Sequence, residues 1–367
     1  MKKIIQVGIP LLFASLCVSA FSAQFKEPVS TDAVVTSQPF KNGLGAAAQG
    51  EKTKEVYLMG LNLSDEQKQK LNKSGIPKVK LSGIPNPISL PASIDLGMSN
   101  VPVLDQGHHG TCVTFAVSAA VDALLSKGDY ISQLCNLELG DYLSKAGFYP
   151  SGWDGSWGVI VLNQMTEFGI INKTNQQKNS CAGLTNYPAK EGAGKSMSLD
   201  EFKTMHEDLN TQLEWQPILS VAQRMGDDPI YKFDGEKVLN EVKASLASSA
   251  ANKNNVRIAF GTFLPAAQCH ARACARFHKA SDTWAFTKAI QNTPETWYDA
   301  GHEMVIVGYD DKAIAIDNEG AKHQGLLTLR NSWGSDVGDG GNFYMSYDYF
   351  KRMVIEVSEI IRSPARE

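Results

Sequence analysis

The stretch Gln106-Gly107-His108-His109-Gly110-Thr111-Cys112 leads directly into an apolar run with helical spacing. It predicts a cysteine at the N-terminus of a helix, where unpaired backbone N–H groups stabilise a thiolate. Gly107, Gly110 and Thr111 are small enough for a substrate backbone to approach the sulfur. Gln106 precedes them, where a folded-back loop can direct its amide N–H₂ at an oxyanion. The alternative for Cys112 is a buried, inert cysteine, and the sequence downstream decides between the two.

Two downstream motifs supply partners for this cysteine. Gly301-His302-Glu303 precedes the apolar run 304–309, and Asn331-Ser332-Trp333-Gly334 follows a second strand-like run at 326–330. An imidazole beside a thiol takes its proton, and a carboxamide can hold that imidazole in its productive orientation. A histidine at the start of a buried strand is by itself more often a core residue, so the combination of motifs carries the interpretation.

Together, Gln106, Cys112, His302 and the motif that begins at Asn331 resemble the papain-like cysteine peptidases, whose catalytic order is Cys, His, Asn. The stretch 90–95, Leu-Pro-Ala-Ser-Ile-Asp, is similar to the start of a mature enzyme of this family. The resemblance covers about residues 90–180 and 256–350. It implies an α+β fold with a helical left lobe, a β-barrel-like right lobe and the active site in the cleft between them. Gln106 and the backbone N–H of Cys112 are then the expected oxyanion hole.

The resemblance also implies which residues bind the substrate. Gly155 and Ser156 lie in a stretch that looks like the Gly-rich strand that pairs with a substrate backbone. Ala300 is expected to border the main side-chain pocket, and Trp333 to cover the site. No cofactor and no metal ion is implied for this chemistry.

Several positions depart from the pattern of the family. Val113 replaces the aromatic residue expected after the cysteine, and Val337 replaces a second tryptophan. His109 and Trp153 stand where many relatives have a pair of bridged cysteines. Glu303 follows the histidine where a small residue is commoner, and we expect it to shift the pKa of His302 or to shape the primed side of the cleft.

The N-terminus has the pattern of a secretory signal peptide over residues 1–23. Lys2-Lys3 is followed by the mostly apolar stretch 4–21 and by small residues at candidate cleavage sites. Cys17 follows the bulky Leu16, which disfavours a lipoprotein anchor. We therefore expect a secreted or periplasmic protein that has no membrane segment once the signal is removed.

Residues 24–89 are predicted to form a propeptide-like segment. A strand is expected near 55–59 and a short helix from about 64 to 71, and Ser-Gly-Ile-Pro occurs at both 74–77 and 82–85. Proline at this density favours extended chain, which cannot build a core by itself. We expect the segment to lie in or across the cleft and to inhibit the enzyme until it is cleaved. A disordered linker is the alternative.

Residues 90–367 are then the peptidase domain. Helices are predicted from Cys112 to about Lys127-Gly128 and over 159–168, and strands at 256–263, 304–309, 326–330 and 342–347. The separation of Cys112 and His302 exceeds the roughly 130–150 residues usual for the family. The polar, mostly helical stretch 182–256 is the expected insertion, and it includes a helix over 234–249.

The cysteine count fits an exported protein. Five of the six cysteines remain after the signal peptide, so one is unpaired, and we expect it to be Cys112. Cys135 and Cys181 are expected to tie the left lobe together. Cys269 and Cys274 could close a small loop or, with His270 and His278 on one helix face, ligate zinc. Export favours the disulfide. The four cysteines expected in disulfides are therefore Cys135, Cys181, Cys269 and Cys274.

The net charge of −4 and a pI near 6.0 argue against a nucleic-acid partner, because no basic stripe is visible. The sequence predicts a monomeric cysteine endopeptidase, made as a zymogen, that hydrolyses peptide bonds through an acyl-enzyme on Cys112. Two alternatives use the same fold. One is a catalytically silent binding protein, and the other is an acyltransferase or peptide ligase with the same residues.

Overall fold

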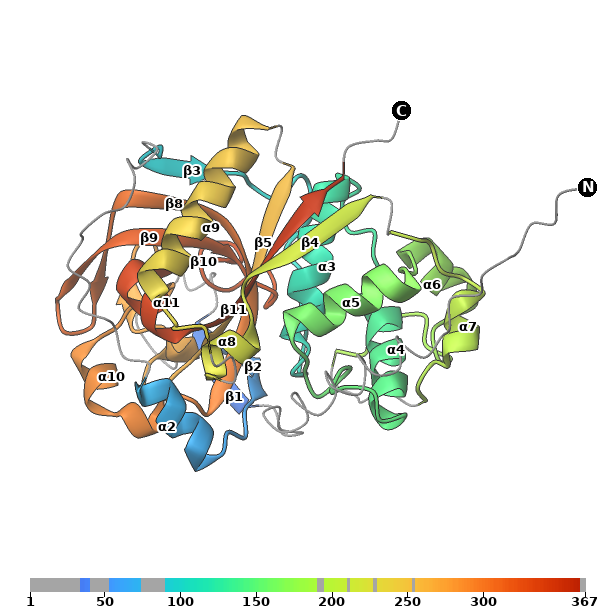
Figure 1. Ribbon diagram of the computed structural model, residues 1–367, viewed down its shortest axis with the longest axis horizontal. Coiled ribbons are helices and arrows are strands. Elements are labelled where there is room, and N and C mark those ends of the chain that lie inside the picture. Colours follow the sequence, from blue (N-terminus) through green and yellow to red (C-terminus); the bar gives the residue numbers. More distant parts are fainter. Residues whose placement is uncertain are drawn as a thin grey trace, which may run out of the picture.

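The computed structural model describes residues 34–39, 53–73, 90–189, 195–209, 212–226, 230–252 and 255–363. The chain forms a lobe of helices beside a lobe built on a curled sheet, as Figure 1 shows. This is the α+β arrangement that the sequence predicted. The predicted signal peptide and the proline-punctuated stretch 74–89 lie outside the described residues. Within the described part of the chain, no helix is both long and apolar enough to cross a membrane.

The helical lobe is built around helix α3, Cys112–Leu125, in which every residue is buried. Its small and branched apolar residues suit a helix that other elements surround on all sides. The helix ends earlier than the sequence predicted, because Ser126 adopts a left-handed conformation with φ of 57°. The other helices of the lobe are α4 Gln133–Lys145, α5 Gly158–Phe168, α6 Lys173–Asn179 and α7 Leu199–Lys203.

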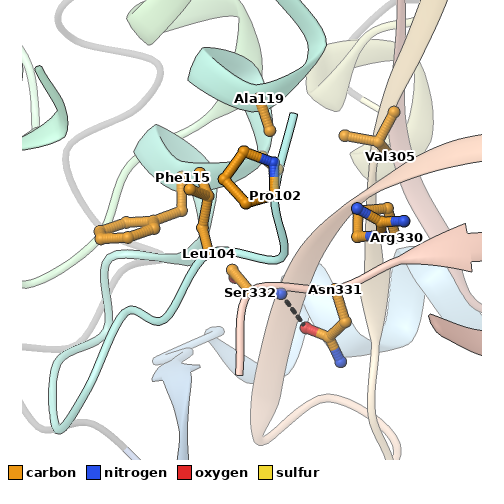
Figure 2. Close-up of a pocket in the computed structure, with 9 residues that line it drawn as sticks. Pro102, Leu104, Phe115, Ala119, Val305, Arg330, Asn331 and Ser332 are labelled. Atoms are coloured by element: carbon orange, nitrogen blue, oxygen red, sulfur yellow. Dashed lines mark hydrogen bonds between the residues drawn. The ribbon is translucent and has the colours of Figure 1, made fainter. Parts of the chain in front are cut away.

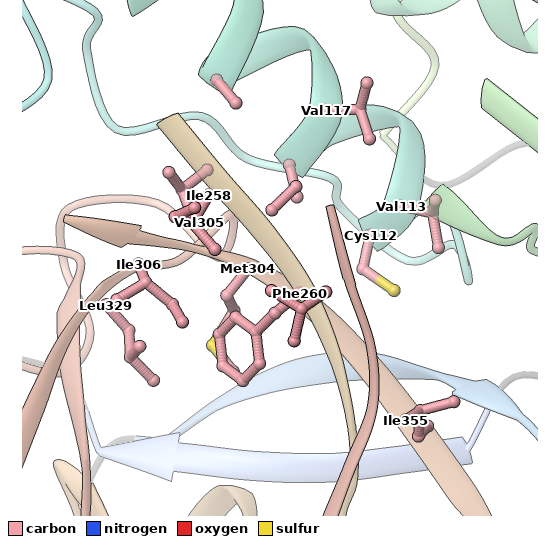
Figure 3. Close-up of a cluster of buried hydrophobic side chains, with 14 of the residues drawn as sticks. Cys112, Val113, Val117, Ile258, Phe260, Met304, Val305, Ile306, Leu329 and Ile355 are labelled. Carbon is pink, nitrogen blue, oxygen red and sulfur yellow. The ribbon is translucent and has the colours of Figure 1, made fainter. Parts of the chain in front are cut away.

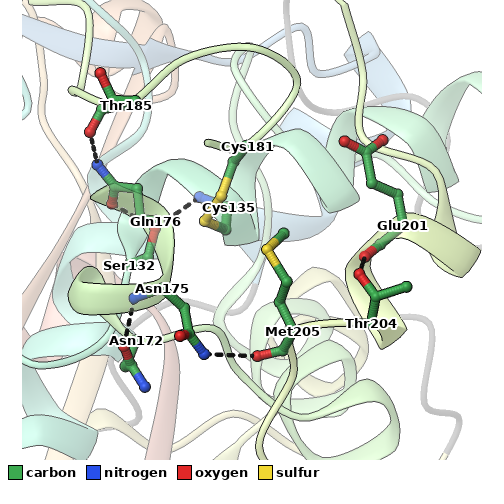
Figure 4. The surroundings of a disulfide bond; sticks show 10 residues. All are labelled: Ser132, Cys135, Asn172, Asn175, Gln176, Cys181, Thr185, Glu201, Thr204 and Met205. Carbon is green, nitrogen blue, oxygen red and sulfur yellow. Dashed lines mark hydrogen bonds between the residues drawn. A yellow bond between two sulfur atoms is a disulfide. The ribbon is translucent and has the colours of Figure 1, made fainter. Parts of the chain in front are cut away.

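A disulfide joins Cys135 in α4 to Cys181 beyond α6, as Figure 4 shows. Ser132 caps α4 by accepting the N–H of Cys135 at 2.9 Å and donates its hydroxyl proton to Gln176 at 2.7 Å. The bridge thus ties α4 to the segment that follows α6. The predicted pairing is confirmed.

The second lobe is a barrel-like sheet. The strand order is β4-β11-β5-β8-β6-β7-β10-β9, and β9 also pairs with β8, so this part of the sheet closes on itself. Its long central strand, β8 Ala300–Asp317, also pairs with the short strand β3 Ser93–Asp95 at the start of the domain. The remaining strands are β4 Leu213–Leu219, β5 Val256–Phe263, β6 Ala275–Arg276, β7 Thr283–Trp284, β9 Lys322–Arg330, β10 Asn342–Ser346 and β11 Val354–Arg362.

Helices pack on this sheet and complete its core. In Figure 1, α9 and α11 lie side by side against the barrel-like lobe, and these two helices contact each other. Asp234 caps α9 by accepting two backbone N–H groups, as its position before the predicted helix suggests. The helices and helical turns of this lobe are α8 Val221–Met225, α9 Gly235–Ala251, η1 His270–Arg272, α10 Lys288–Asn292, η2 Pro294–Thr296 and α11 Tyr347–Met353.

One sequence prediction about local structure is incomplete and another is wrong. The stretch 182–256 contains the helices α7, α8 and α9, but it also contains an edge strand, β4, which pairs antiparallel with β11. Leu213 and Leu219, at the two ends of β4, are buried, and the residues between them are more exposed. Pairing with β11 therefore stabilises the strand conformation of this polar stretch. Residues 269–278 are a helical turn followed by a short strand and not a helix. Cys269 and Cys274 form a disulfide there, which occupies both sulfurs that the zinc alternative required.

The described parts of the propeptide-like segment, 34–39 and 53–73, include a strand that joins the sheet lobe. Its strand β2, Thr53–Gly60, pairs antiparallel with β1, Val34–Pro39, and helix α2, Asp65–Lys73, follows. The C-terminal end of β2 continues the sheet, because Met59 and Gly60 pair with the first residues of β8. The predicted strand and short helix are therefore confirmed.

Two buried glutamates lie where the lobes meet. Glu356 in β11 accepts the backbone N–H of Gly158, at the start of α5, at 2.8 Å. Glu303 in β8 and Glu356 are each only 2% exposed. Burial, reinforced by the Glu356 charge, raises the pKa of Glu303 well above its ordinary value. Burial raises the pKa of Glu356 to about 7 despite the N–H groups of Gly158 and Val159, which lower it. At neutral pH Glu303 therefore favours the protonated form, whereas Glu356 is close to its titration midpoint.

Replacing Glu303 by glutamine should flatten the pH dependence of stability. A carboxyl whose pKa is raised by folding stabilises the protein fully below its ordinary pKa of 4.5. That stabilisation is lost as the pH rises toward the folded-state pKa, at about 1.4 kcal/mol per pH unit for each retained proton. Urea unfolding of wild type and E303Q between about pH 4 and pH 9 measures the difference. The exposed Glu319 provides the control E319Q, and equal pH slopes in E303Q and wild type would contradict the assignment.

Candidate active site

Cys112 is the first residue of α3 and the free cysteine of the described chain. Its N-cap, Thr111, makes no side-chain capping hydrogen bond. Figure 3 shows Cys112 at the start of the helix, beside apolar side chains packed between α3 and the strands. The backbone N–H groups of Glu303, Val113 and Met59 form hydrogen bonds with the sulfur. Since Glu303 directly follows His302, the sulfur lies at the start of the strand that carries the imidazole.

His302 is held by Asn331, at a distance of 2.8 Å between Nε2 and Oδ1. The same Oδ1 accepts the backbone N–H of Ser332 at 2.7 Å, the contact drawn in Figure 2. An atom that accepts an N–H is the amide oxygen, so Nε2 of His302 carries the proton and donates it. Nδ1 is then the unprotonated nitrogen, and it has no hydrogen-bond partner among the described residues. This is the tautomer that a proton acceptor for a thiol requires.

Trp333 covers this hydrogen-bonded pair. Its ring stacks on the imidazole of His302, with 4.4 Å between ring centroids and 20° between planes, and it is 1% exposed. Trp284 and Phe343 pack edge-on against Trp333 from the barrel side. Because water is excluded, the His302–Asn331 bond faces little competition.

Gln106 is oriented by a hydroxyl on the opposite lobe. Its Oε1 accepts the proton of Ser332 Oγ at 2.7 Å, which places the N–H₂ group on the other side of the amide. That Nε2 donates to the backbone oxygen of His109 at 2.8 Å and to that of Tyr57 at 3.1 Å. Tyr57 belongs to β2, so an N–H of Gln106 is engaged by a carbonyl of the propeptide-like segment.

Strand β2 covers the cysteine. Met59 donates its backbone N–H to the sulfur of Cys112 and pairs with Gly301 next to His302. Leu58 and Met59 are buried, and Cys112 is 0% exposed. A chain segment therefore occupies the space that a substrate would need to reach the sulfur.

The covered site holds both reactive groups in their neutral forms. Burial raises the pKa of the Cys112 thiol to about 12. The backbone N–H of Glu303 lowers this pKa, and the charge of the Glu303 carboxylate raises it. Burial lowers the pKa of His302 to about 4, although the bond to Asn331 raises it. A thiolate–imidazolium pair is disfavoured as long as water is kept from both groups.

The N-terminal part of β2 is anchored by charge and by ring stacking. Nζ of Lys54 lies 2.6 Å from Asp105 Oδ2, 3.3 Å from Asp336 Oδ1 and 2.9 Å from the backbone oxygen of Trp333. Tyr57 stacks on His108 with 4.7 Å between ring centroids. Both anchors flank Gln106 and hold β2 across the two lobes.

The residues predicted to bind substrate are placed as follows. Gly155, with φ of 122°, and Ser156 lie in an irregular segment before α5, so the expected Gly-rich strand is not a strand. Ser156 is buried and donates its hydroxyl proton to the backbone oxygen of Pro150. Ala300 pairs with Gly60 of the propeptide-like segment. Trp333 lies over His302, as described above.

Two departures from the family pattern have a structural outcome. The rings of His109 and Trp153 meet edge to face with centroids 4.9 Å apart, so a ring contact stands where many relatives have a cysteine bridge. Glu303 is not among the groups that shift the pKa of His302. Of the two expectations for Glu303, a role in shaping the primed side of the cleft stays a prediction. The alternation of side chains along β8 directs Glu303 away from the His302 face and toward Glu356.

Sequence reasoning missed the contacts that assemble the covered site. Tyr57 was an ordinary residue of the predicted strand 55–59, Lys54 directly preceded that strand, and nothing local marked the partners of either residue. Glu356 did carry a signal, because it is a single charge within the apolar run Met-Val-Ile-Glu-Val at 353–357. A lone acid in a buried strand indicates either a paired group or a functional one.

A family model matches most of this chain, and several solved protease structures are similar to it. The papain family cysteine protease model matches residues 90–361. Xylellain, a cysteine protease from Xylella fastidiosa, shares 18% identity over 79% of this chain and 95% of its own, with a TM-score of 0.47. The proform of the ragweed pollen protease Amb a 11 shares 17% identity over 79% of this chain and 71% of its own, with a TM-score of 0.45. No curated protein sequence matches this chain.

The family match spans most of the chain and begins at Leu90, where the sequence resembles the start of a mature enzyme. It includes the segment that precedes α3 and the strand that His302 begins, as well as the motif from Asn331 to Gly334. With both lobes and these motifs in place, the chain belongs to the papain family of cysteine proteases and is a cysteine-type peptidase.

Proposed function

We propose that this chain is a secreted cysteine endopeptidase made as a zymogen, in which Cys112 is the nucleophile and His302 the general base and acid. The observation that carries the proposal is the state of His302. Its Nε2 is bound to Asn331 at 2.8 Å, and its Nδ1 is left without a partner among the described residues. The backbone N–H of the next residue contacts the sulfur of Cys112.

The geometry supports a complete acylation and deacylation cycle. The thiol proton passes to Nδ1 of His302, and the sulfur attacks the carbonyl carbon of the scissile peptide bond. Gln106 Nε2 and the backbone N–H of Cys112 stabilise the oxyanion. The C–N bond breaks as the imidazolium gives its proton to the leaving amine. Water, deprotonated by His302, then attacks the thioester, and the sulfur leaves as the acid product is released.

The propeptide-like segment is the proposed inhibitor of this cycle. Tyr57 engages the N–H₂ group of Gln106, and Met59 contacts the sulfur. Removal of β2 would admit water to the site, so the thiol pKa would fall and the imidazole pKa would rise toward their ordinary values. The same event would free the oxyanion donor. The segment would therefore control both the protonation of Cys112 and His302 and the access of substrate to them.

Export is the proposed setting of this enzyme. Two disulfides, Cys135–Cys181 and Cys269–Cys274, are typical of the oxidising environment outside the cytosol. Together with the signal-like N-terminus, they support the proposal that the protein acts in the periplasm or outside the cell. The proposed substrate is a peptide or protein.

Replacement of Cys112 by alanine should abolish peptide hydrolysis, and His302→Ala should reduce kcat/KM by about 10²-fold or more. An epoxide or vinyl-sulfone probe should label wild type once, because the four other cysteines of the described chain are in disulfides. Cleavage of fluorogenic peptides by the processed protein measures hydrolysis, and the intact mass of the processed protein measures labelling by the probe.

The same experiment separates the competing functions. Hydrolysis that survives in C112A would refute the proposed nucleophile. A wild-type protein that neither takes up the probe nor cleaves any peptide of a random library would indicate a silent binding protein. Products formed with an added amine acceptor, in place of free acids, would indicate acyl transfer.

Replacement of Lys54 by alanine should weaken inhibition by the propeptide-like segment. The variant loses a part-buried ion pair with Asp105 and Asp336, so intact protein should hydrolyse a small fluorogenic peptide about two- to tenfold faster. High salt should narrow the difference. Initial rates are measured while gels show that the chain is uncleaved.

Lys68 in α2 is the matched control, because its side chain makes no ion pair among the described residues. K68A changes the same charge in the same segment without touching the cleft. If K54A and K68A hydrolyse the peptide at the same rate as wild type, the Lys54 anchor plays no part in inhibition.

A further inference from the structure

A short segment at the start of the long polar stretch, Tyr187-Pro188-Ala189, holds the loop that carries Gln106. Tyr187 donates its phenol proton to the backbone oxygen of Gln106 at 2.7 Å. The backbone oxygen of Ala189 accepts the N–H of His108 at 2.8 Å. The segment therefore meets the loop at two points of its backbone, and the catalytic cycle gives no reason for this contact.

The phenol of Tyr187 also reaches the residue before the nucleophile. Its oxygen lies 3.1 Å from the hydroxyl oxygen of Thr111. A carbonyl oxygen can only accept, so the phenol proton goes to Gln106 and the Thr111 hydroxyl donates to the phenol oxygen. Burial raises the pKa of this phenol, which keeps it protonated. One chain of hydrogen bonds thus joins Thr111, next to Cys112, to the backbone of the residue that supplies the oxyanion donor.

His109 links the same segment to the side-chain amide of Gln106. The ring Nε2 of His109 lies 2.6 Å from the backbone oxygen of Pro188, so this nitrogen carries the proton. The backbone oxygen of His109 accepts the N–H₂ group of Gln106 at 2.8 Å. Ser332 binds the opposite end of that amide through Oε1. The direction of the Gln106 N–H₂ group therefore depends on where His109 is held.

Ring packing secures the segment where many relatives have a cysteine bridge. The ring of Tyr187 stacks on Trp153, with 5.6 Å between centroids and 21° between planes. It also meets the rings of His109 and Phe115 edge to face. Phe115 lies about one turn into α3, so the cluster ties the loop to the helix that begins at Cys112. With aromatic residues at the bridge positions, noncovalent contacts hold the loop.

The loop and the segment approach each other as closely as their backbones allow. Gly107 has a φ of 60°, and a Cβ atom there would lie 2.4 Å from the backbone oxygen of Ala189. Glycine satisfies both the left-handed turn and the close contact. A larger residue would push the segment away from the loop.

We propose that Tyr187 is a positioning residue for the oxyanion hole. Its phenol and the backbone after it hold the loop so that Gln106 Nε2 and the backbone N–H of Cys112 converge on one oxyanion. This inference rests on the proposed peptidase function. Tyr187 acts through Gln106 and Thr111 and not on the reacting atoms. Oxyanion donors act where charge develops in the transition state, so a small displacement of the loop lowers the rate more than it weakens substrate binding.

The test removes single hydroxyl groups and keeps the rings and the side-chain volumes. Y187F loses both bonds of the phenol, and T111V loses the hydroxyl that donates to it. Thr111 makes no side-chain capping bond, so T111V leaves the cap of α3 unchanged. Y130F is the matched control, because Tyr130 follows the C-terminal end of α3 and its hydroxyl bonds to Glu207 in the same lobe.

Two reactions are compared on full-length protein after processing. Hydrolysis of a fluorogenic peptide passes through an oxyanion in both acylation and deacylation. Alkylation of Cys112 by iodoacetamide forms a C–S bond and releases iodide, and it develops no oxyanion. Both rates are expressed per site titrated with the epoxide probe, so they count only protein with an intact site.

Y187F should lower kcat by about three- to thirtyfold and change KM by less than about twofold. T111V should lower kcat by about two- to tenfold. The double variant should lose less than the product of the two factors, because both substitutions break the same chain of hydrogen bonds. The rate of alkylation and its pH profile should match wild type in all three variants. Y130F should match wild type in both reactions.

Equal hydrolysis per titrated site in Y187F and wild type would overturn the inference. A parallel fall of hydrolysis and alkylation, or a shifted pH profile, would also overturn it, because the defect would then lie in the thiol and imidazole or in general loosening. If Y187F yields no titratable site, T111V decides by the same comparison. Wild-type protein that is alkylated but hydrolyses no peptide would instead refute the proposed function.

Discussion

The site depends on the packing of α3 against the strands β5 and β8. This helix is buried along its whole length, and it contacts both strands. Its first residue therefore reaches the start of β8, where His302 lies. Neither lobe contains the chemistry alone, because the thiol comes from the helical lobe and the imidazole from the sheet. A change in this packing would separate the two groups even with every reactive side chain present.

Hydrogen bonds across the lobe boundary then define the orientation of each group. Asn331 determines which nitrogen of His302 carries the proton, and it is itself oriented by the N–H of Ser332. The hydroxyl of Ser332 orients Gln106 from the other lobe. One short segment thus positions both the base and the oxyanion donor, so the Asn-Ser-Trp-Gly motif has a separate physical task for each of its first three residues.

Burial of the site has consequences for charge as well as for access. Strand β2 removes water from Cys112 and His302, and burial moves their pKa values in opposite directions, to about 12 and about 4. The charge of Glu303, when this carboxyl is ionised, raises the pKa of the thiol further. The covered reactive centre consequently carries little charge, although the titratable side chains of Cys112, Glu303 and Glu356 meet there.

The sequence by itself determined the composition of the site and the main elements around it. Helical spacing after Cys112, the apolar strand after His302 and the Asn331 motif are local signals, and each gave the expected helix, strand or loop. The disulfides Cys135–Cys181 and Cys269–Cys274 were also among the predicted pairings. The edge strand β4 was missed because its polar residues pair with β11, a partner far along the chain.

Only the tertiary structure decided which distant groups meet. It brought Tyr57 to Gln106, Lys54 to Asp105 and Asp336, and Glu356 to Glu303. It also determined the protonation states, since burial depends on what covers a group and not on the neighbouring residues in sequence. Local sequence patterns reflect backbone periodicity, whereas contacts between remote segments arise only when the whole chain has packed, and this is the physical reason for the division.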